Sequence, residues 1–297
     1  MVTTHPDHRQ PSLLPFLALL LNAFIWGVSW WPFRQLQQVG LHPLWATSLL
    51  FCVALAGLLA LRPGAWKGLR QPRLWWLLAA TGLTNVCFNW AVAIGDVVRV
   101  VLLFYLMPGW AVLLAWGLLG ERPTRAALLR LALAVAGVLV VLWPAGGVAA
   151  TALSVADLLA VLGGLGFALT NVLLKRLHAV PGTERMAAMF TGGVLVAGLA
   201  AALGTHFGVV PALPPLWEHG GALLVVAGLG VAFFLGNMGL QYGASRLPTS
   251  TTSIVMLTEV VFASVSSIAL GAATLSLRTL VGAGLILLAS ILAARSD

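Results

Sequence analysis

The sequence predicts an all-α polytopic membrane protein, with ten transmembrane helices arranged as two inverted five-helix repeats. Of its 297 residues, 60% are apolar and only 8% are charged, whereas soluble domains carry about 25% charged residues. The apolar residues form long separate windows, and only helices or closed barrels satisfy backbone hydrogen bonds in lipid. These windows are too long for barrel strands and do not alternate in hydropathy. A soluble enzyme and a disordered chain are therefore excluded.

Ten apolar windows follow a polar tail over residues 1–12, and each is close to the length of about 20 residues that a spanning helix needs. The windows cover 13–33, 44–61, 74–93, 97–117, 126–143, 154–174, 187–205, 220–240, 249–270 and 275–294. The first window is too long for a cleaved signal peptide, so we interpret it as the first span.

Basic residues predict the orientation of these spans. The net charge is +8, and the Lys and Arg residues lie in short loops between the apolar windows. If the N-terminus is cytoplasmic, all of them fall on the cytoplasmic side except Arg34, Arg99 and Arg278, as the positive-inside rule requires. We therefore expect both termini in the cytoplasm and the lipid bilayer as the partner of the apolar surface. Nucleic acid is not an expected partner.

The two halves of the chain, 13–147 and 148–297, resemble each other, and together they form a single integral membrane domain. Residues of the first span recur 141 positions later in the sixth, and Asn89 and Asn237 are each followed six residues later by glycine. Because each half contains five spans, the second half enters the membrane from the opposite side. Inverted repeats of this kind can enclose one cavity that opens to either side. The matched pairs are Trp26 with Phe167, Arg34 with Lys175, Asn89 with Asn237 and Gly95 with Gly243.

Three stretches resemble a known family. They are "FIWGVSWWPFR" at 24–34, "AIGDVVRVVLLFYLMPGWAVLLAWGLLGERPT" at 93–124 and "PTSTTSIVMLTEVVFASVSSIALGAATLS" at 248–276. They look like the drug/metabolite transporter superfamily, EamA type, and the tryptophan-rich first span most resembles its bacterial aromatic amino-acid exporters. The sequence departs from the family pattern where Val260 replaces the proline after Glu259, and where Ala272 and Ala273 replace a Gly-Glu corner.

The resemblance implies a secondary transporter in the bacterial inner membrane. It would export small organic solutes, above all amino acids with a preference for aromatic ones, by alternating access around a midplane cavity. The alternative is an exporter of another metabolite or drug, such as a nucleobase or a sugar, with proton antiport. The sequence gives no sign of a resident metal or cofactor, and we expect a monomer or a weak homodimer.

Aromatic and amide side chains in the first and sixth spans are the first candidates for the cavity. Trp26 and Trp30 are four residues apart, and so are Phe167 and Asn171 in the sixth span. Each pair therefore shares one helix face. Aromatic faces in a cavity can stack on a ring or hold an ammonium group. The alternative for Trp30 is a place in the aromatic belt at the membrane interface.

Polar residues in the third, eighth and ninth spans are the second group of candidates. Asn85 and Asn89 form a stripe on one helix face, and Asn237 lies in the eighth span. Their alternative role is hydrogen bonding between helices. Glu259 lies near the middle of the ninth span, where an acid costs about 2.5–3.5 kcal/mol. It can meet a substrate ammonium, carry a proton or tie helices together.

Two features of the fourth span complete the candidate set. Tyr105 brings a hydroxyl that needs a partner when buried, and Pro108 removes a backbone hydrogen bond. A bent gate helix and a static kink are both consistent with this pair. At the outer end of the span, Asp96 and Arg99 stand three residues apart, which favours a local ion pair or a mouth charge. Asp157 is interpreted as an interfacial acid at a helix N-terminus.

Two other classes of membrane protein are less consistent with the sequence. The histidines lie in tails, loops or span ends, and the chain has no HExxH motif and no GxSxG with a partner histidine. We therefore predict no catalytic residues, and an intramembrane enzyme remains a distant alternative. A channel would require a filter-like run or a ring of charges, and neither is visible.

Overall fold

The computed structural model describes residues 13–120, 124–142, 153–218, 220–247, 252, 255–272 and 276–294, and all its regular secondary structure there is helical. The predicted tail over 1–12 lies outside the described residues. The helices are α1 (Leu14–Val28), α2 (Trp30–Gln38), α3 (Pro43–Leu61), η1 (Pro63–Arg70), η2 (Pro72–Leu74), α4 (Trp75–Ile94), α5 (Val97–Phe104), α6 (Met107–Leu119), α7 (Arg125–Leu142), α8 (Val155–Arg176), α9 (Gly182–His206), η3 (Leu216–Glu218), α10 (Gly220–Ala244), α12 (Thr258–Ala269) and α13 (Leu277–Ala294).

Seven helical segments in the described part are long and apolar enough to cross a membrane. Two further apolar helices are shorter, at Thr258–Ala269 and Leu277–Ala289. These lengths support a multi-pass membrane protein, and the count of ten spans stays a prediction. The seven segments are Leu14–Gln38, Pro43–Leu61, Pro72–Ile94, Val97–Leu118, Val155–Arg176, Gly182–His206 and Gly220–Ala244.

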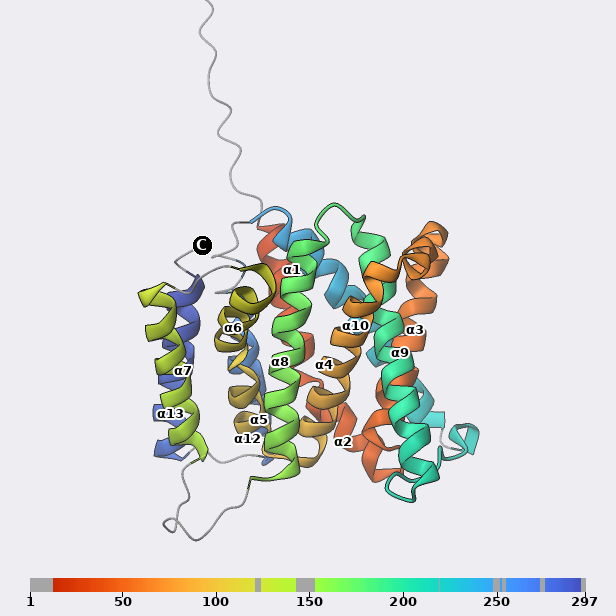
Figure 1. Cartoon of the computed structure of the whole chain (residues 1–297). Helices are drawn as coiled ribbons and strands as arrows, with labels where there is room; N and C mark the ends of the chain where they lie inside the picture. Colours follow the sequence, from red (N-terminus) through yellow and green to blue (C-terminus); the bar gives the residue numbers. More distant parts are fainter. Residues whose placement is uncertain are drawn as a thin grey trace, which may run out of the picture.

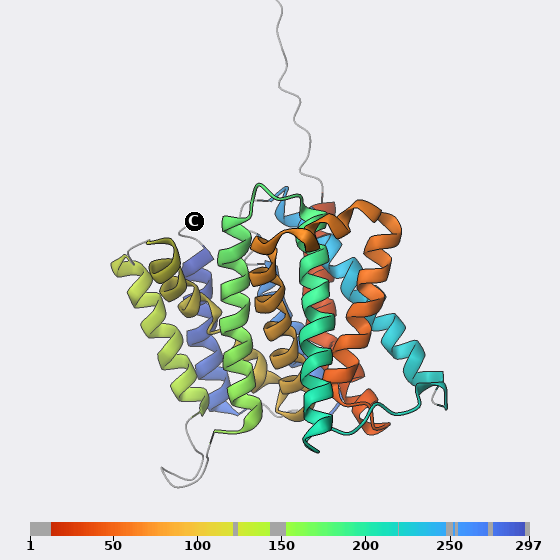
Figure 2. The same ribbon diagram turned by 45° about the vertical axis from the view of Figure 1, so that its right-hand side comes forward.

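The two halves of the chain run in opposite directions (Figure 1). Helix α1 begins at the upper end of the view and runs downward, whereas α8, its counterpart in the second half, begins at the lower end and runs upward. Helix α13 ends at the end where α1 begins. Helices α7 and α13 lie side by side at one edge in both ribbon views (Figure 2).

Most contacts between the two halves have a counterpart. When each helix is replaced by its equivalent in the other half, one contact becomes another contact that is also present. Helix α4 packs against α8 and α9, and its counterpart α10 packs against α1 and α3. Helix α12 packs against α1, just as α5 and α6 pack against α8. Three contacts map onto themselves: α3 with α9, α7 with α13, and α5 with α12. The interface between the repeats is therefore pseudo-twofold symmetric.

Two glycines show that the sequence offsets correspond to structural equivalence. A Cβ on Gly95 would lie 2.6 Å from the Cβ of Ala156, and one on Gly243 would lie 2.7 Å from the carbonyl oxygen of Pro15. Gly243 follows Gly95 by 148 positions and Ala156 follows Pro15 by 141. Each contact is thus the symmetry mate of the other, and both need glycine because the helices cross too closely for a side chain.

Helical breaks interrupt both the fourth and the ninth span. The fourth is divided between α5 and α6 at Tyr105 and Leu106, and the ninth has a turn at Leu257 before α12 begins. Pro108, in the first turn of α6, has no N–H to donate to the carbonyl of Phe104. The first backbone bonds of α6 run to the carbonyl of Leu106, from the N–H of Gly109 at 2.9 Å and from that of Trp110 at 3.2 Å. The predicted bend in the fourth span is therefore a break in the helix.

Replacing Gly230 by alanine should destabilise the fold, whereas Gly228→Ala should not. A Cβ on Gly230 would lie 2.5 Å from the Cβ of Val53 and 2.7 Å from the carbonyl oxygen of Leu50, so α10 and α3 would have to separate. Overpacking costs about 1–3 kcal/mol. Around Gly228 no heavy atom lies within 4 Å of the added carbon, and alanine gains up to about 1 kcal/mol in helix propensity. The free energy of unfolding of each variant can be measured in detergent micelles. Equal stabilities of the two variants would contradict the close contact between α10 and α3 at Gly230.

Candidate functional site

Trp26 lies at the junction of the two repeats. Its indole is 4.6 Å from the ring centroid of Phe233 on α10 and 5.7 Å from that of Phe88 on α4, both in edge-to-face geometry. It is half-buried and packs against both of the largest apolar clusters of the protein. The predicted cavity residue Trp26 is thus held between the third and eighth spans, which are symmetry mates.

Asn22 lies one turn before Trp26 on α1 and was not among the predicted site residues. It is only 1% exposed, and both its amide nitrogen and its oxygen lack hydrogen-bonding partners among the described residues. Gly236 of α10 faces it, since a Cβ there would lie 3.1 Å from the amide nitrogen. An unsatisfied buried polar group costs about 1–3 kcal/mol. A water molecule or a polar solute that bonds this amide would remove that cost.

Tyr105 and Glu259 meet where the two broken spans touch. The tyrosine hydroxyl lies 3.3 Å from Oε2 of Glu259 and donates at 3.1 Å to the carbonyl oxygen of Met256, just before the break at Leu257. Both side chains are buried. The structure therefore brings together two candidates that are 154 positions apart in the sequence, one from each repeat.

Trp30 contacts the face of α12 that carries Glu259. Its indole N–H donates to Oγ of Ser266 at 2.9 Å, and Ser266 is seven residues after Glu259. Trp30 is 2% exposed. This burial argues against a place in the aromatic belt, which needs contact with the interface.

The asparagines predicted for the cavity make contacts within and between helices. Asn85 donates to the carbonyl of Thr81 at 2.9 Å, and Asn89 donates to Oγ1 of Thr47 on α3 at 3.1 Å. Asn237 donates to a carbonyl of its own helix. Only the bond of Asn89 joins two helices, so the interhelical alternative is favoured for Asn89 alone. The buried oxygen of Asn89 is still unpartnered within the described part of the chain.

Phe167 and Asn171 share one face of α8 but have different surroundings. The ring of Phe167 lies 5.5 Å from that of Phe104, whereas Asn171 is exposed. Phe104 in turn lies 4.7 Å from Phe88 and so links Phe167 to the ring cluster around Trp26. The described structure does not join Asn171 to that cluster.

Three aromatic residues in this cluster were missed by the sequence reasoning: Phe88, Phe104 and Phe233. Each lies in an apolar window, and the residue types around it do not show which way its ring faces. The available signal was Trp26 itself, because a half-buried indole inside a bundle needs aromatic or small neighbours on the facing helices.

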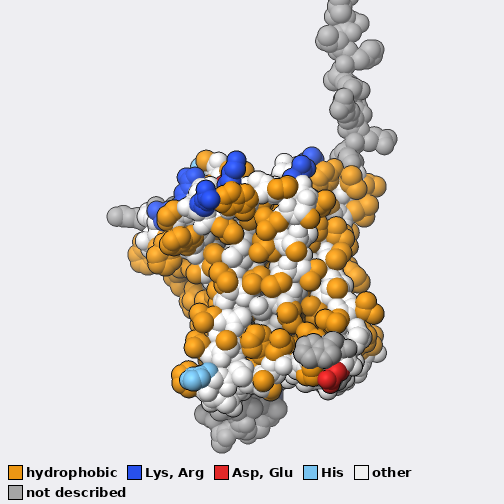
Figure 3. Space-filling view, turned by 90° about the vertical axis from the view of Figure 1, so that its right-hand side faces the viewer, with side chains coloured by type: hydrophobic (Ala, Val, Ile, Leu, Met, Phe, Trp, Pro, Cys, Tyr) orange, Lys and Arg blue, Asp and Glu red, His pale blue; other side chains and the backbone are white. Residues whose placement is uncertain are grey.

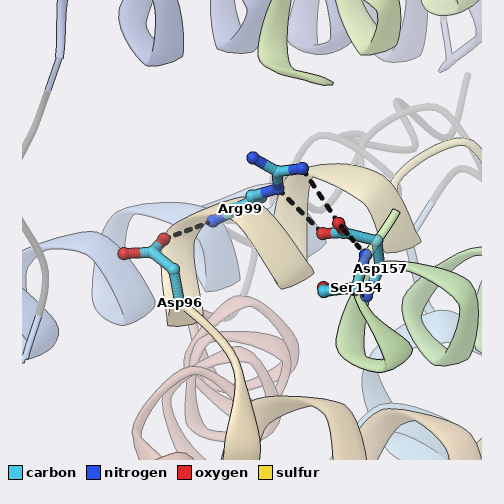
Figure 4. A network of polar contacts seen from close by, with 4 residues as sticks. All are labelled: Asp96, Arg99, Ser154 and Asp157. Atoms are coloured by element: carbon cyan, nitrogen blue, oxygen red, sulfur yellow. Dashed lines mark hydrogen bonds and ion pairs between the residues drawn. The ribbon is translucent and has the colours of Figure 1, made fainter. Parts of the chain in front are cut away.

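A charged network, drawn in Figure 4, lies at the N-terminal ends of α5 and α8. Helix α8 begins at the opposite end of the protein from the start of α1 (Figure 1). The guanidinium of Arg99 forms two parallel bonds with the carboxylate of Asp157, at 2.8 and 2.9 Å. Asp96 instead accepts the backbone N–H of Arg99 at 2.8 Å and caps α5. Of the two predicted roles of Asp96 and Arg99, the local ion pair is wrong, because Asp96 caps its own helix while Arg99 reaches across to α8. The role of a mouth charge stays a prediction.

Two depressions open beside this network. One, of about 390 Å³, is lined by residues of the network together with Ile94 and Gly95. The other, of about 490 Å³, is lined by Arg34, Gln37, Gln38, Ala93 and Ile94. Arg34 donates to the carbonyls of Val92 and Gly95 at the C-terminal end of α4, where cations are favoured by the helix dipole.

A family model describes both repeats. The EamA-like transporter family matches residues 13–143 and 154–295. The chain belongs to the EamA-like transporter family. It is therefore a small-molecule transporter of the drug/metabolite transporter superfamily, built from two repeats, and its family consists of transporters rather than enzymes. The match identifies the family as a whole, so the resemblance to the aromatic amino-acid exporters stays a prediction.

A solved structure described as "Crystal structure of protein" resembles this EamA-like transporter over 95% of the chain and 98% of its own, with a TM-score of 0.59. The two sequences are 22% identical, so this likeness supports the fold alone. A search among curated proteins found no match.

Proposed function

We propose that this transporter exports small organic solutes, most of all amino acids with aromatic side chains, by alternating access around a central cavity. The observation that carries the proposal is the placement of Trp26 between Phe88 and Phe233, one turn from the unpartnered amide of Asn22. Aromatic faces beside an unsatisfied amide suit a solute that has both a ring and polar ends.

Each part of an amino acid has a complementary group here. A substrate ring can stack against the indole of Trp26 once the repeats move apart. The amide nitrogen of Asn22 can donate to the substrate carboxylate. The carboxylate of Glu259 can accept from the substrate ammonium in exchange for the hydroxyl of Tyr105.

The broken spans supply the mobile elements of this mechanism. Each repeat contains one such break, at Tyr105–Leu106 and at Leu257. Discontinuous helices at a repeat interface often carry the binding site and the moving segments of secondary transporters. Pro108 then acts as a gating residue, because it keeps the break open in every state.

We propose a bacterial inner-membrane location with both termini in the cytoplasm. Lys and Arg side chains gather at the end where α1 begins (Figure 3), which agrees with the positive-inside rule. In this proposal, 13–147 and 148–297 are the two repeats of one membrane domain, and the transporter works as a monomer or a weak homodimer.

A second candidate is proton-coupled export of another metabolite or drug. The buried position of Glu259 favours it, because a carboxyl group inside a span is a common proton carrier. In this version the acid exchanges a proton with each transport cycle and the aromatic cluster recognises a different ring, such as a nucleobase.

Purified protein in liposomes distinguishes these functions. The vesicles are loaded with labelled amino acids, nucleobases or sugars, and efflux and counterflow are followed with and without a pH gradient. We expect saturable efflux of phenylalanine, tyrosine or tryptophan above that of the other solutes. Efflux of a nucleobase or a sugar alone would contradict the amino-acid proposal. Acceleration by the gradient would favour proton coupling.

A further inference from the structure

The connection between α3 and α4 forms an amphipathic surface of its own. Its first part, η1, is a 3-10 helix over Pro63–Arg70. Such a helix has three residues per turn, so side chains three apart lie in one row. The buried row holds Ala65 and Gly68, the second holds Trp66 and Leu69, and the third holds Lys67 and Arg70.

The exposed rows combine cations with tryptophans. Trp66 is 39% exposed, and Trp75 and Trp76, at the start of α4, are 57% and 73% exposed. The segment 62–76 contains no Asp or Glu. Tryptophan in this setting is typical of the headgroup level of a membrane. The four cations of the segment are all exposed: Arg62, Lys67, Arg70 and Arg73.

The structure fixes the position of the guanidinium of Arg70, which lies over the indole of Trp66, with its central carbon 4.0 Å from the ring centroid. A guanidinium stacked in this way keeps its N–H edges available for a planar anionic group. Phosphate takes two parallel hydrogen bonds from such an edge. Lys67 in the same row adds a second positive charge three residues away.

The other side of the segment is attached to the second repeat. A Cβ on Gly68 would lie 2.6 Å from the carbonyl oxygen of Glu184 in the first turn of α9. The amide of Gln71 also donates to the carboxylate of Glu184. The segment is therefore held against the helix bundle, with its cationic and aromatic rows facing outward.

We propose that segment 62–76 is a binding site for the phosphate headgroups of anionic phospholipids. The phosphate bonds Arg70 and Lys67, while Trp66, Trp75 and Trp76 lie among the upper parts of the acyl chains. Because the segment joins α3 and α4 of the first repeat and rests on α9 of the second, a lipid bound here lies beside a contact between the repeats. This inference concerns lipid binding and does not depend on the transported solute.

Lipid binding to the full-length protein tests the site directly. Phosphatidylglycerol and phosphatidylcholine with the same acyl chains are titrated into detergent-solubilised protein, and bound lipid is counted by native mass spectrometry. Each Lys or Arg near an anionic membrane surface contributes about 1 kcal/mol. Lys67→Gln with Arg70→Gln should therefore weaken phosphatidylglycerol binding by about tenfold to thirtyfold, and phosphatidylcholine binding should not change.

Lys175→Gln with Arg176→Gln is the matched control. It removes the same charge from the last turn of α8, and it should leave the preference for phosphatidylglycerol intact. An equal loss in this control, or equal binding of the two lipids to the wild type, would overturn the proposal. Trp66→Leu keeps every charge and should weaken phosphatidylglycerol binding by about threefold, as expected for an exposed cation–π contact. Unchanged affinity in that variant would contradict the stacked geometry.

Discussion

Glu259→Gln is expected to reduce export by about tenfold to a hundredfold, the loss typical of removing a charged hydrogen-bonding group. The glutamine side chain fills the same volume, and its amide oxygen can still accept from the hydroxyl of Tyr105, which lies 3.3 Å from the native carboxylate. It can neither neutralise a substrate ammonium nor carry a proton. The fold should therefore survive while transport falls, and efflux from liposomes together with a melting curve measures both.

Glu218→Gln is the matched control for this prediction, because it makes the same substitution at an exposed acid and should leave export unchanged. A pH gradient separates the two functional roles. Loss of gradient-driven export with preserved counterflow would assign proton transfer to Glu259, and loss of both would assign solute binding. Full activity of the Glu259→Gln variant would contradict both roles in transport, and would leave Glu259 only the structural role of bonding α12 to Tyr105.

The helical architecture was predictable because composition alone excludes most alternatives. A chain with 8% charged residues and long apolar windows can satisfy its backbone in lipid only as helices or a barrel. The internal repeat was also predictable, because Asn89 and the glycine six residues after it recur in order in the second half. Their offsets identified helix crossings that the structure contains, as at Gly95 with Ala156.

The candidate site was predictable where its residues are rare in their surroundings. Tyr105 and Glu259 stand out in apolar spans because a buried hydroxyl or carboxyl needs a partner, and the structure pairs them. Phe88 and Phe233 could not be chosen as site residues from the sequence. An aromatic ring in an apolar window can face lipid, the core or a cavity, and the sequence pattern is the same in each case. Their role follows from the packing of α4 and α10 around Trp26, which is a tertiary property.

The partners of charged side chains were the hardest feature to predict, because the acid nearest in the sequence need not be the one that forms the ion pair. Asp96 is three residues from Arg99, but the N-terminus of α5 has free backbone N–H groups that an aspartate caps well. That local demand occupies Asp96 and leaves the guanidinium of Arg99 for a more distant carboxylate. The acid it reaches, Asp157, is itself part of a capping box with Ser154, so bonds other than the ion pair also hold its position.

Arg99→Gln is expected to lower the free energy of unfolding by about 2–3 kcal/mol. Breaking a buried ion pair costs about 3–5 kcal/mol, and the 30% exposure of Arg99 reduces that loss through solvent screening. The carboxylate of Asp157 is 4% exposed and would keep only its bonds within the capping box. Because the pair joins α5 of the first repeat to α8 of the second, the loss should appear as weaker association of the repeats.

Asp96→Asn and a double-mutant cycle distinguish this pair from a local one. Asparagine caps helices about as well as aspartate, so Asp96→Asn should change stability by less than about 0.5 kcal/mol. Adding Asp157→Asn to Arg99→Gln should cost less than the sum of the two single changes, with a coupling of about 1–3 kcal/mol. Unfolding of the four proteins in mixed micelles measures the cycle. Strict additivity, or a larger loss in Asp96→Asn than in Arg99→Gln, would mean that the contact between α5 and α8 does not hold the repeats together.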